Sequence, residues 1–248
     1  MAKRQLAAAF AVMAAMGLIY LGTLTTPEAV PAGSERITQN VTLAALDGVM
    51  LQMDVCDSAQ SARISAARLT GRGSAGYVRT DDGYRVLGIW SQTQSEAENM
   101  QTTLAENGVP TELYVCNGQT LTLKVTADAA QIEALTAALH AVEMAAVQPG
   151  RIAAQMDSGT MTADRARGMM AMLLADVQAA RTDFAGTEAA APLGPALIQL
   201  LDETEKALVP LTKISPATDL MLAGEMRCAG MGVYFVREEM MERVGGQR

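Results

Sequence analysis

Apolar and polar side chains alternate along two short stretches of this chain, and a helix-like run follows each of them. Residues 49–56 alternate leucine, methionine and valine with polar neighbours, and residues 84–90 are also rich in strand-forming side chains. A period of two predicts a strand with one buried and one exposed face. Ser58 is placed to cap the first helix, and Ser91 is placed to cap a second helix over residues 95–107.

A further strand closes each copy, so the pattern of strand, helix and strand occurs twice. The closing strands are predicted over residues 76–80 and 111–116. Asp81-Asp82-Gly83 predicts a tight hairpin between the second and third strands. These elements predict a βαββαβ domain, in which the fourth, first, third and second strands lie side by side. Asn117-Gly118 predicts another hairpin, into a fifth strand over residues 121–126 that would extend the sheet at its edge.

Beyond Asp128 the apolar residues recur at helical spacing instead. A Pro-Gly pair at residues 149–150 predicts a break in the first of these helices. We therefore expect residues 128–248 to be an all-α region, either a helical hairpin or a small bundle. The helices are predicted over residues 129–147, 162–184, 196–208 and 217–243.

The N-terminal residues predict a membrane anchor. Lys3 and Arg4 precede a charge-free, largely apolar run over residues 5–27, and a membrane-spanning helix needs about 17–25 such residues. The positive-inside rule places residues 1–4 in the cytoplasm and the body of the chain outside. The chain is therefore predicted to be a single-pass protein of the cytoplasmic membrane, with residues 28–47 as a linker to an extracytoplasmic domain. The competing interpretation is a cleaved signal peptide, which also exports the body.

Composition argues against several classes of function. A net charge of −8 disfavours a nucleic-acid partner, which needs a basic surface. The single histidine, His140, lies in a helical pattern and the cysteines lack metal-ligand spacing, so no metal or other cofactor is expected. Asp81 and Asp82 are the best carboxylate pair, but turn chemistry explains them better than catalysis does. We therefore expect no enzymatic activity.

The expected strand order decides whether two of the three cysteines can pair. Cys56 ends the first predicted strand and Cys116 ends the fourth. Because these strands are antiparallel neighbours, the cysteines lie at opposite ends of the pair, about 16 Å apart at ~3.3 Å per residue. A disulfide joins Cα atoms no more than about 7 Å apart. We therefore predict that Cys56 and Cys116 are not bonded.

Two strands and a helix carry a pattern of apolar, glycine and aromatic residues that a known family shares. The matching residues are Leu51-Gln52-Met53, Tyr84-Arg85-Val86-Leu87-Gly88-Ile89-Trp90, Glu96-Ala97, Leu104 and Gly108. In this pattern residues 48–116 resemble the SPOR domain, a bacterial peptidoglycan-binding module of cell-division and sporulation proteins. Asp54 and Cys56 depart from it, since the family has a glycine and an aromatic residue there. The expected fold class is α+β: a transmembrane helix, a ferredoxin-like SPOR domain over residues 48–127 with its added edge strand, and the all-α region.

The resemblance implies binding to peptidoglycan glycan strands that have lost their peptide stems, on the sheet face that the helices leave open. Aromatic rings can stack on the C–H edges of sugars, while amides and hydroxyls hydrogen-bond to their polar groups. The expected contacts are Gln52, Ser58, Trp90 and Ser91. Each has a plainer interpretation: Trp90 as a cap on the core edge, Gln52 as an ordinary exposed residue, and both serines as helix N-caps. Asp54, on the same face by parity, would repel an anionic glycan.

Two non-catalytic functions therefore compete. The first is a peptidoglycan-binding protein tethered to the bacterial cytoplasmic membrane and serving division or sporulation. The second is a membrane-anchored interaction protein whose SPOR-like domain and Met-rich C-terminal helices bind a protein partner, and Asp54 and Cys56 favour it. The third class, an enzyme such as a wall hydrolase, has no recognisable motif in this chain.

Overall fold

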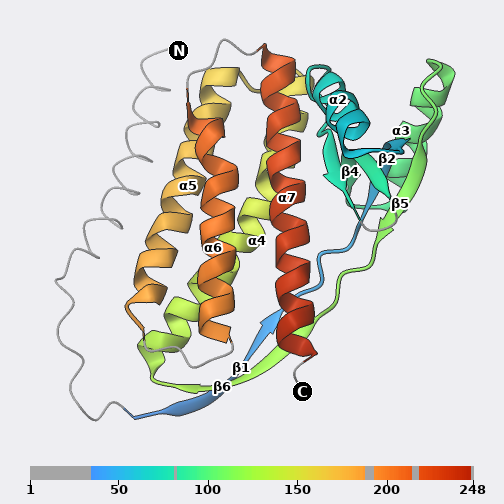
Figure 1. Ribbon diagram of the computed structural model, residues 1–248. Helices are drawn as coiled ribbons and strands as arrows, with labels where there is room; N and C mark the ends of the chain where they lie inside the picture. The colour runs from blue at the N-terminus through green and yellow to red at the C-terminus, as the bar shows by residue number, and fades with distance from the viewer. Residues whose placement is uncertain (1–34, 81–82, 188–192, 214–217, 247–248) are drawn as a thin grey trace, which may run out of the picture. The chain divides into compact units, whose positions relative to one another are not determined.

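The structure analysed is a computed structural model, which describes residues 35–80, 83–187, 193–213 and 218–246. The helices and strands belong to one structural unit, Ile37–Arg248. Figure 1 shows a small sheet with two short helices beside a group of long helices.

A four-stranded antiparallel sheet forms the first half, as the alternating pattern predicted. Its strands are β2 (Gly48–Cys56), β3 (Tyr77–Arg79), β4 (Tyr84–Ser91) and β5 (Glu112–Cys116), in the order β3-β4-β2-β5. This is the predicted order of fourth, first, third and second strands, read from the opposite edge. The helices α2 (Ala59–Thr70) and α3 (Gln94–Glu106) follow β2 and β4 and pack on one face of the sheet.

The fifth strand does not extend this sheet, so the prediction of an added edge strand is wrong. Instead, β6 (Leu121–Ala127) pairs with β1 (Ile37–Leu43) in a separate two-stranded ribbon. β1 lies within the stretch predicted to be a linker. No hairpin forms at Asn117-Gly118, because Gly118 lies against the backbone of Leu46 and its N–H donates to Asp47 (N···Oδ1 3.1 Å). The pair β2–β5 thereby continues into the ribbon (Figure 1).

The second half is a bundle of long helices. A buried Pro149 lies inside α4, so the predicted break there is wrong. Proline removes one backbone hydrogen bond from a helix and usually bends it, and here the close approach of α7 at Gly230 covers that turn. The helices are α4 (Ala129–Asp157), α5 (Ala163–Ala185), α6 (Leu193–Leu208) and α7 (Asp219–Gly245), with a 3-10 turn η1 (Val209–Thr212) after α6.

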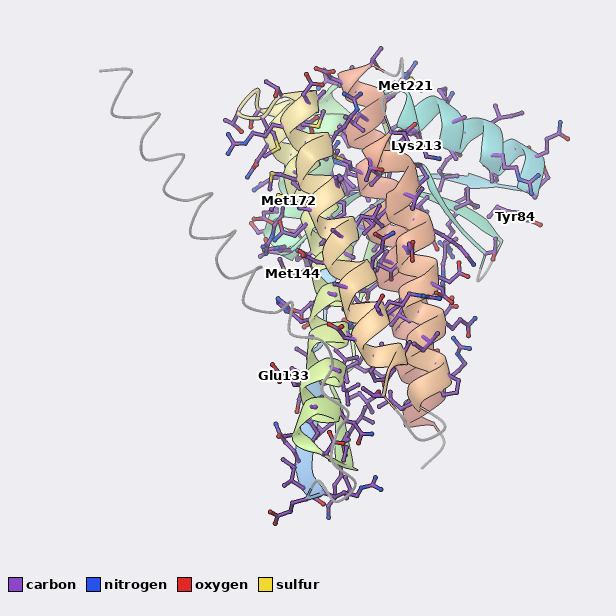
Figure 2. All side chains as sticks on the ribbon, turned by 90° about the vertical axis from the view of Figure 1, so that its left-hand side faces the viewer. Tyr84, Glu133, Met144, Met172, Lys213 and Met221 are labelled. Carbon is purple, nitrogen blue, oxygen red and sulfur yellow. The ribbon has the colours of Figure 1, made fainter. Side chains whose placement is uncertain are left out.

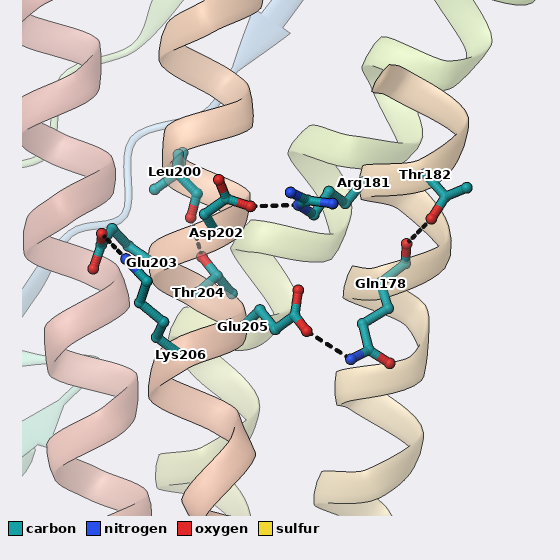
Figure 3. A network of polar contacts seen from close by, with 9 residues as sticks. All are labelled: Gln178, Arg181, Thr182, Leu200, Asp202, Glu203, Thr204, Glu205 and Lys206. Atoms are coloured by element: carbon teal, nitrogen blue, oxygen red, sulfur yellow. Dashed lines mark hydrogen bonds and ion pairs between the residues drawn. The ribbon is translucent and has the colours of Figure 1, made fainter. Parts of the chain in front are cut away.

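Polar contacts join the outer helices α5 and α6 (Figure 3). Arg181 forms an ion pair with Asp202, and Gln178 donates to Glu205 (Nε2···Oε1 2.7 Å). Such half-exposed surface contacts contribute little to stability. Figure 2 shows the side of the bundle that carries α5, where Met172 is 61% exposed.

The bundle covers the second face of the sheet. Met50 and Leu87 of that face are fully buried and join the same core as the bundle side chains. Two residues of α7 supply the ring contacts: Tyr77 stacks on Phe235 with centroids 5.2 Å apart, and Trp90 packs on Tyr234 at 5.0 Å. The expectation of an open sheet face is therefore wrong. A chain with a second apolar sheet face needs a cover, and the C-terminal helices provide it.

No helix in the described ranges is both long and apolar enough to cross a membrane. The segment predicted to be the anchor, residues 5–27, lies outside the described residues. This finding corrects the predicted fold class and the predicted single-pass location in the cytoplasmic membrane, both of which depended on a transmembrane helix. The fold that the structure supports is an α+β unit made of a four-stranded sheet, a two-stranded ribbon and a helical bundle.

The cysteines confirm the disulfide prediction. Cys56, Cys116 and Cys228 are all free thiols. Cys116 pairs in register with Gly48 at the start of β2, whereas Cys56 ends that strand. The strand order alone therefore keeps these two thiols apart.

Candidate functional site

Gln52 is the predicted contact that the structure removes from the surface. Its side chain is 5% exposed, donates to Glu112 (Nε2···Oε2 2.8 Å) and accepts from Arg85 (NH1···Oε1 2.6 Å). An irregularity in the pairing of β2 with β4 follows Gln52. It turns Asp54 toward α2, where Asp54 accepts from Ser65 (Oγ···Oδ2 2.6 Å). Parity counting missed this irregularity, because a bulge shifts every later side chain to the other face.

The two predicted serine contacts have different positions. Ser58 is the N-cap of α2 and accepts from the backbone N–H of Ser61 (3.1 Å). Ser91 is not a cap, because the N-cap of α3 is Thr93, two residues further along the chain. Ser91 is instead 7% exposed at the end of β4. Ser58 and Gln52 therefore have structural roles, and Ser91 is left without one.

Trp90 lies between the sheet and the bundle. Its indole packs over Gly48, where a Cβ atom would come within 1.7 Å of the indole nitrogen. One side of the ring contacts Tyr234 of α7. Its Nε1 is enclosed and has no hydrogen-bond partner among the described residues. Only glycine at position 48 allows this approach, so Trp90 is a core contact as well as a candidate ligand contact.

Trp90 and Ser91 line a cavity of about 640 Å³ between the two halves, which we call the α3–α4 cleft. One wall comes from the end of β4 and from α3, and the other from α4 and α7. The lining is mainly apolar, and a cavity of this size and character at the meeting of two substructures is a common ligand site. The lining includes Trp90, Ser91, Glu96, Met100, Val147, Arg151 and Met231.

Charged side chains at the cleft fall into two groups. Arg227 pairs with Asp157 and donates to the Gly73 carbonyl, which ties the bundle to the loop after α2. Glu96 of α3 and Arg151 of α4 line the cleft, and neither has an ion-pair partner in the part of the chain that the structure describes. The cleft thus presents one carboxylate, Glu96, and one guanidinium, Arg151.

Two cysteine side chains, one of the sheet and one of α7, have raised pKa values. Burial raises the pKa of the Cys116 thiol to about 11, and burial also raises the pKa of Cys228. Both thiols are therefore protonated near neutral pH, whereas a nucleophilic cysteine needs a lowered pKa. Within the described ranges, no three metal-ligating side chains come together.

Comparisons with protein families, with curated proteins and with solved structures found no match to this chain. The candidate site is therefore defined by the geometry of the cleft alone. Met100, Arg151 and Met231 were missed as site residues, because the cleft joins three distant segments, residues 89–100, 146–158 and 227–231. No local pattern in the sequence indicates that these three segments lie together.

Proposed function

We propose that this protein is a non-catalytic interaction protein that binds an apolar segment of a protein partner in the α3–α4 cleft. The observation that carries the proposal is the largely apolar cavity of about 640 Å³ between the sheet and the bundle. Met100 is exposed at the cleft and is flexible and polarisable, which suits varied apolar side chains. Trp90 supplies a rigid aromatic contact of the kind that dominates protein interfaces.

The exposure of the methionines shows which of them a partner could contact. Met170, Met226, Met231 and Met240 are fully buried in the core, so they are unavailable to a partner. The exposed Met172 is on α5, and Met100 at the cleft is 37% exposed. Met100 is therefore the methionine that the cleft itself offers to a partner.

A second candidate function is binding to denuded peptidoglycan glycan strands, as the SPOR resemblance implies. One observation favours it: Trp90 and Ser91, two of the expected contacts, line the same cleft. The sheet face that the family resemblance points to is covered by α7. Glycan binding would therefore have to use the cleft.

Filling the cleft tests both candidates. Gly150 lines it, and a Cβ atom there meets nothing within 4 Å. Gly150→Phe should occupy the cavity without disturbing the fold. Gly168→Phe on α5 is the matched control, since position 168 is also helical and open but does not line the cleft.

The probes are peptides enriched from a random library on the full chain, and purified denuded glycan strands. Fluorescence of Trp90, the only tryptophan, reports binding. We expect enriched peptides to bind the native chain and Gly168→Phe equally, and Gly150→Phe at least about tenfold more weakly. Glycan strands that bind with the same dependence, in the absence of peptide binding, would establish the second candidate. If neither probe distinguishes Gly150→Phe, the cleft is not the binding site.

A further inference from the structure

The outer edge of β1 lacks the protection that the other strand edges have. Among the described residues β1 pairs only with β6, and the register of that pair has no shift. Natural proteins usually protect an edge with a charge, a proline, a bulge or a short strand, because its free N–H and C=O groups attract other chains. The edge strands β3, β5 and β6 carry Arg79, Glu112 and Lys124, whereas β1 has no charged residue and no proline.

The first half of β1 is open to solvent on both faces. Residues 37–40 are all exposed, and the apolar Ile37 is 42% exposed. Val41 and Leu43, further along the strand, are buried in the core. An added strand can therefore approach the edge at residues 37–40 while the rest of β1 holds the ribbon in place.

Two cavities lie along β1 on the side of α4, and we call them together the β1 furrow. The larger has a volume of about 530 Å³, is mainly apolar and is lined by Ile37 and Gln39 of the strand. The smaller, of about 180 Å³, is lined by residues 41–43. Thr136 and His140 of α4 line both cavities, so the two adjoin.

The furrow follows β1 over its full length. It is lined by α4 residues from Ala129 to Glu143, which is roughly 21 Å of helix, and the strand itself covers roughly 20 Å. Alternate side chains of a strand added to this edge point to the same face. Main-chain hydrogen bonds to β1 would then provide affinity and side chains in the two cavities would provide specificity, as when a peptide extends a sheet.

Two carboxylates give the furrow its charge preference. Glu133, labelled on α4 in Figure 2, lines the larger cavity and Glu143 lines the smaller one. Neither forms an ion pair within the described ranges, whereas Arg237 at the smaller cavity is already paired with Glu238. We propose that the outer edge of β1 binds an extended segment of a partner protein, with an apolar side chain in the larger cavity and basic side chains beside Glu133 and Glu143. The furrow shares no lining residue with the α3–α4 cleft, so this inference does not depend on the proposed function.

Backbone methylation tests whether the segment binds as a strand. The probe is a labelled peptide of about nine residues, in which threonine alternates with valine and with a lysine near each end, and fluorescence anisotropy with the full chain measures its binding. One derivative is N-methylated at odd positions and another at even positions. Only alternate N–H groups of an added strand face its neighbour, so exactly one derivative should bind at least about tenfold more weakly. Equal binding of the two derivatives would overturn strand addition.

Substitutions on α4 test the furrow itself. Ala137→Phe fills the larger cavity from an exposed position, and Ala130→Phe is the matched control, since Ala130 is also exposed on α4 but lines neither cavity. Ala137→Phe should weaken binding at least about tenfold, and Ala130→Phe should leave it unchanged. Glu133→Gln and the exchange of the peptide lysines for glutamine should each weaken binding by about two- to fivefold, and not additively, as for a solvent-exposed ion pair.

Other results would contradict the proposal in distinguishable ways. Peptides that bind the native chain and Ala137→Phe equally do not use the furrow, and peptides lost only in Gly150→Phe bind the α3–α4 cleft instead. If the chain associates with itself at rising concentration and Ala137→Phe prevents this, the occupant of the edge is a second copy. Unchanged far-UV circular dichroism of each variant confirms that it has folded.

Discussion

At the scale of single residues, burial changes the roles of side chains that look exposed from their spacing. Gln52 bridges Arg85 and Glu112 beneath the surface, and Asp54 bonds to α2. Gly48 is required because the indole of Trp90 occupies the space of its side chain. These assignments follow from local geometry that a period of two does not encode.

The pH dependence of stability belongs to this scale. Burial raises the pKa of Cys116 from 9.0 to about 11, so the native chain keeps this proton to higher pH than the unfolded chain. The stabilisation is complete below pH 9 and is lost as the pH rises toward 11. We expect this thiol to account for a loss on the order of 2–3 kcal/mol over that range. Denaturant unfolding measured at several pH values checks the slope.

Cys116→Ala is the control for that prediction. Burial also raises the pKa of Tyr77 and Cys228, so part of the alkaline loss should persist in the variant. The difference between the two slopes isolates the Cys116 thiol. Equal slopes for the native chain and Cys116→Ala would contradict the assignment.

At the scale of elements, α7 has two partners at once. It packs against α4 in the bundle and covers β3 and β4 of the sheet. Phe235 lies at the centre of the second contact: it stacks on Tyr77, meets the edge of Tyr114, and lies under the guanidinium of Arg79 at 4.5 Å. This is the contact that closes the sheet face where a ligand was expected.

Truncating that side chain should therefore be costly. We expect Phe235→Ala to lower the free energy of unfolding by about 3–5 kcal/mol, because it removes a buried ring and leaves a cavity. Phe235→Leu should cost less, since most of the volume remains. Met172→Ala, at an exposed site on α5, should change stability by no more than about 0.5 kcal/mol. Chemical denaturation provides the measurement, and a Phe235→Ala cost as small as that of Met172→Ala would show that α7 does not seal the sheet.

At the scale of the whole molecule, the sheet and the bundle share one core. Met50 and Leu87 from the sheet belong to the same buried cluster as Met226 and Met231 from α7. Arg237 of α7 adds a hydrogen bond between the halves. It is buried and donates to the Ala44 carbonyl, in the connection between β1 and β2. Two halves joined in this way are expected to unfold together.

Cooperativity can be measured with the single tryptophan. Trp90 reports on the contact between the halves, whereas far-UV circular dichroism mainly reports on the helices of the bundle. We expect both signals to change at the same denaturant concentration. A Trp90 transition that clearly precedes the loss of helix would mean that the sheet separates from the bundle before the bundle unfolds.

Local signals in the sequence determined much of the fold. The alternation in residues 49–56 and 84–90, the N-cap at Ser58 and the expected strand order all recur in the structure. These features depend on neighbours a few residues apart, where side-chain period and capping chemistry act directly. The strand order then sufficed to keep Cys56 and Cys116 apart.

Only the tertiary structure decided which surfaces remain available. The partner of β6, the continuation of α4 through Pro149 and the cover over Trp90 all depend on segments far away in the chain. Apolar periodicity shows that a face is buried but does not say against what, because hydrophobic burial has no direction. The α3–α4 cleft is the space left where those long-range contacts meet, so its residues could be identified only once the chain was folded.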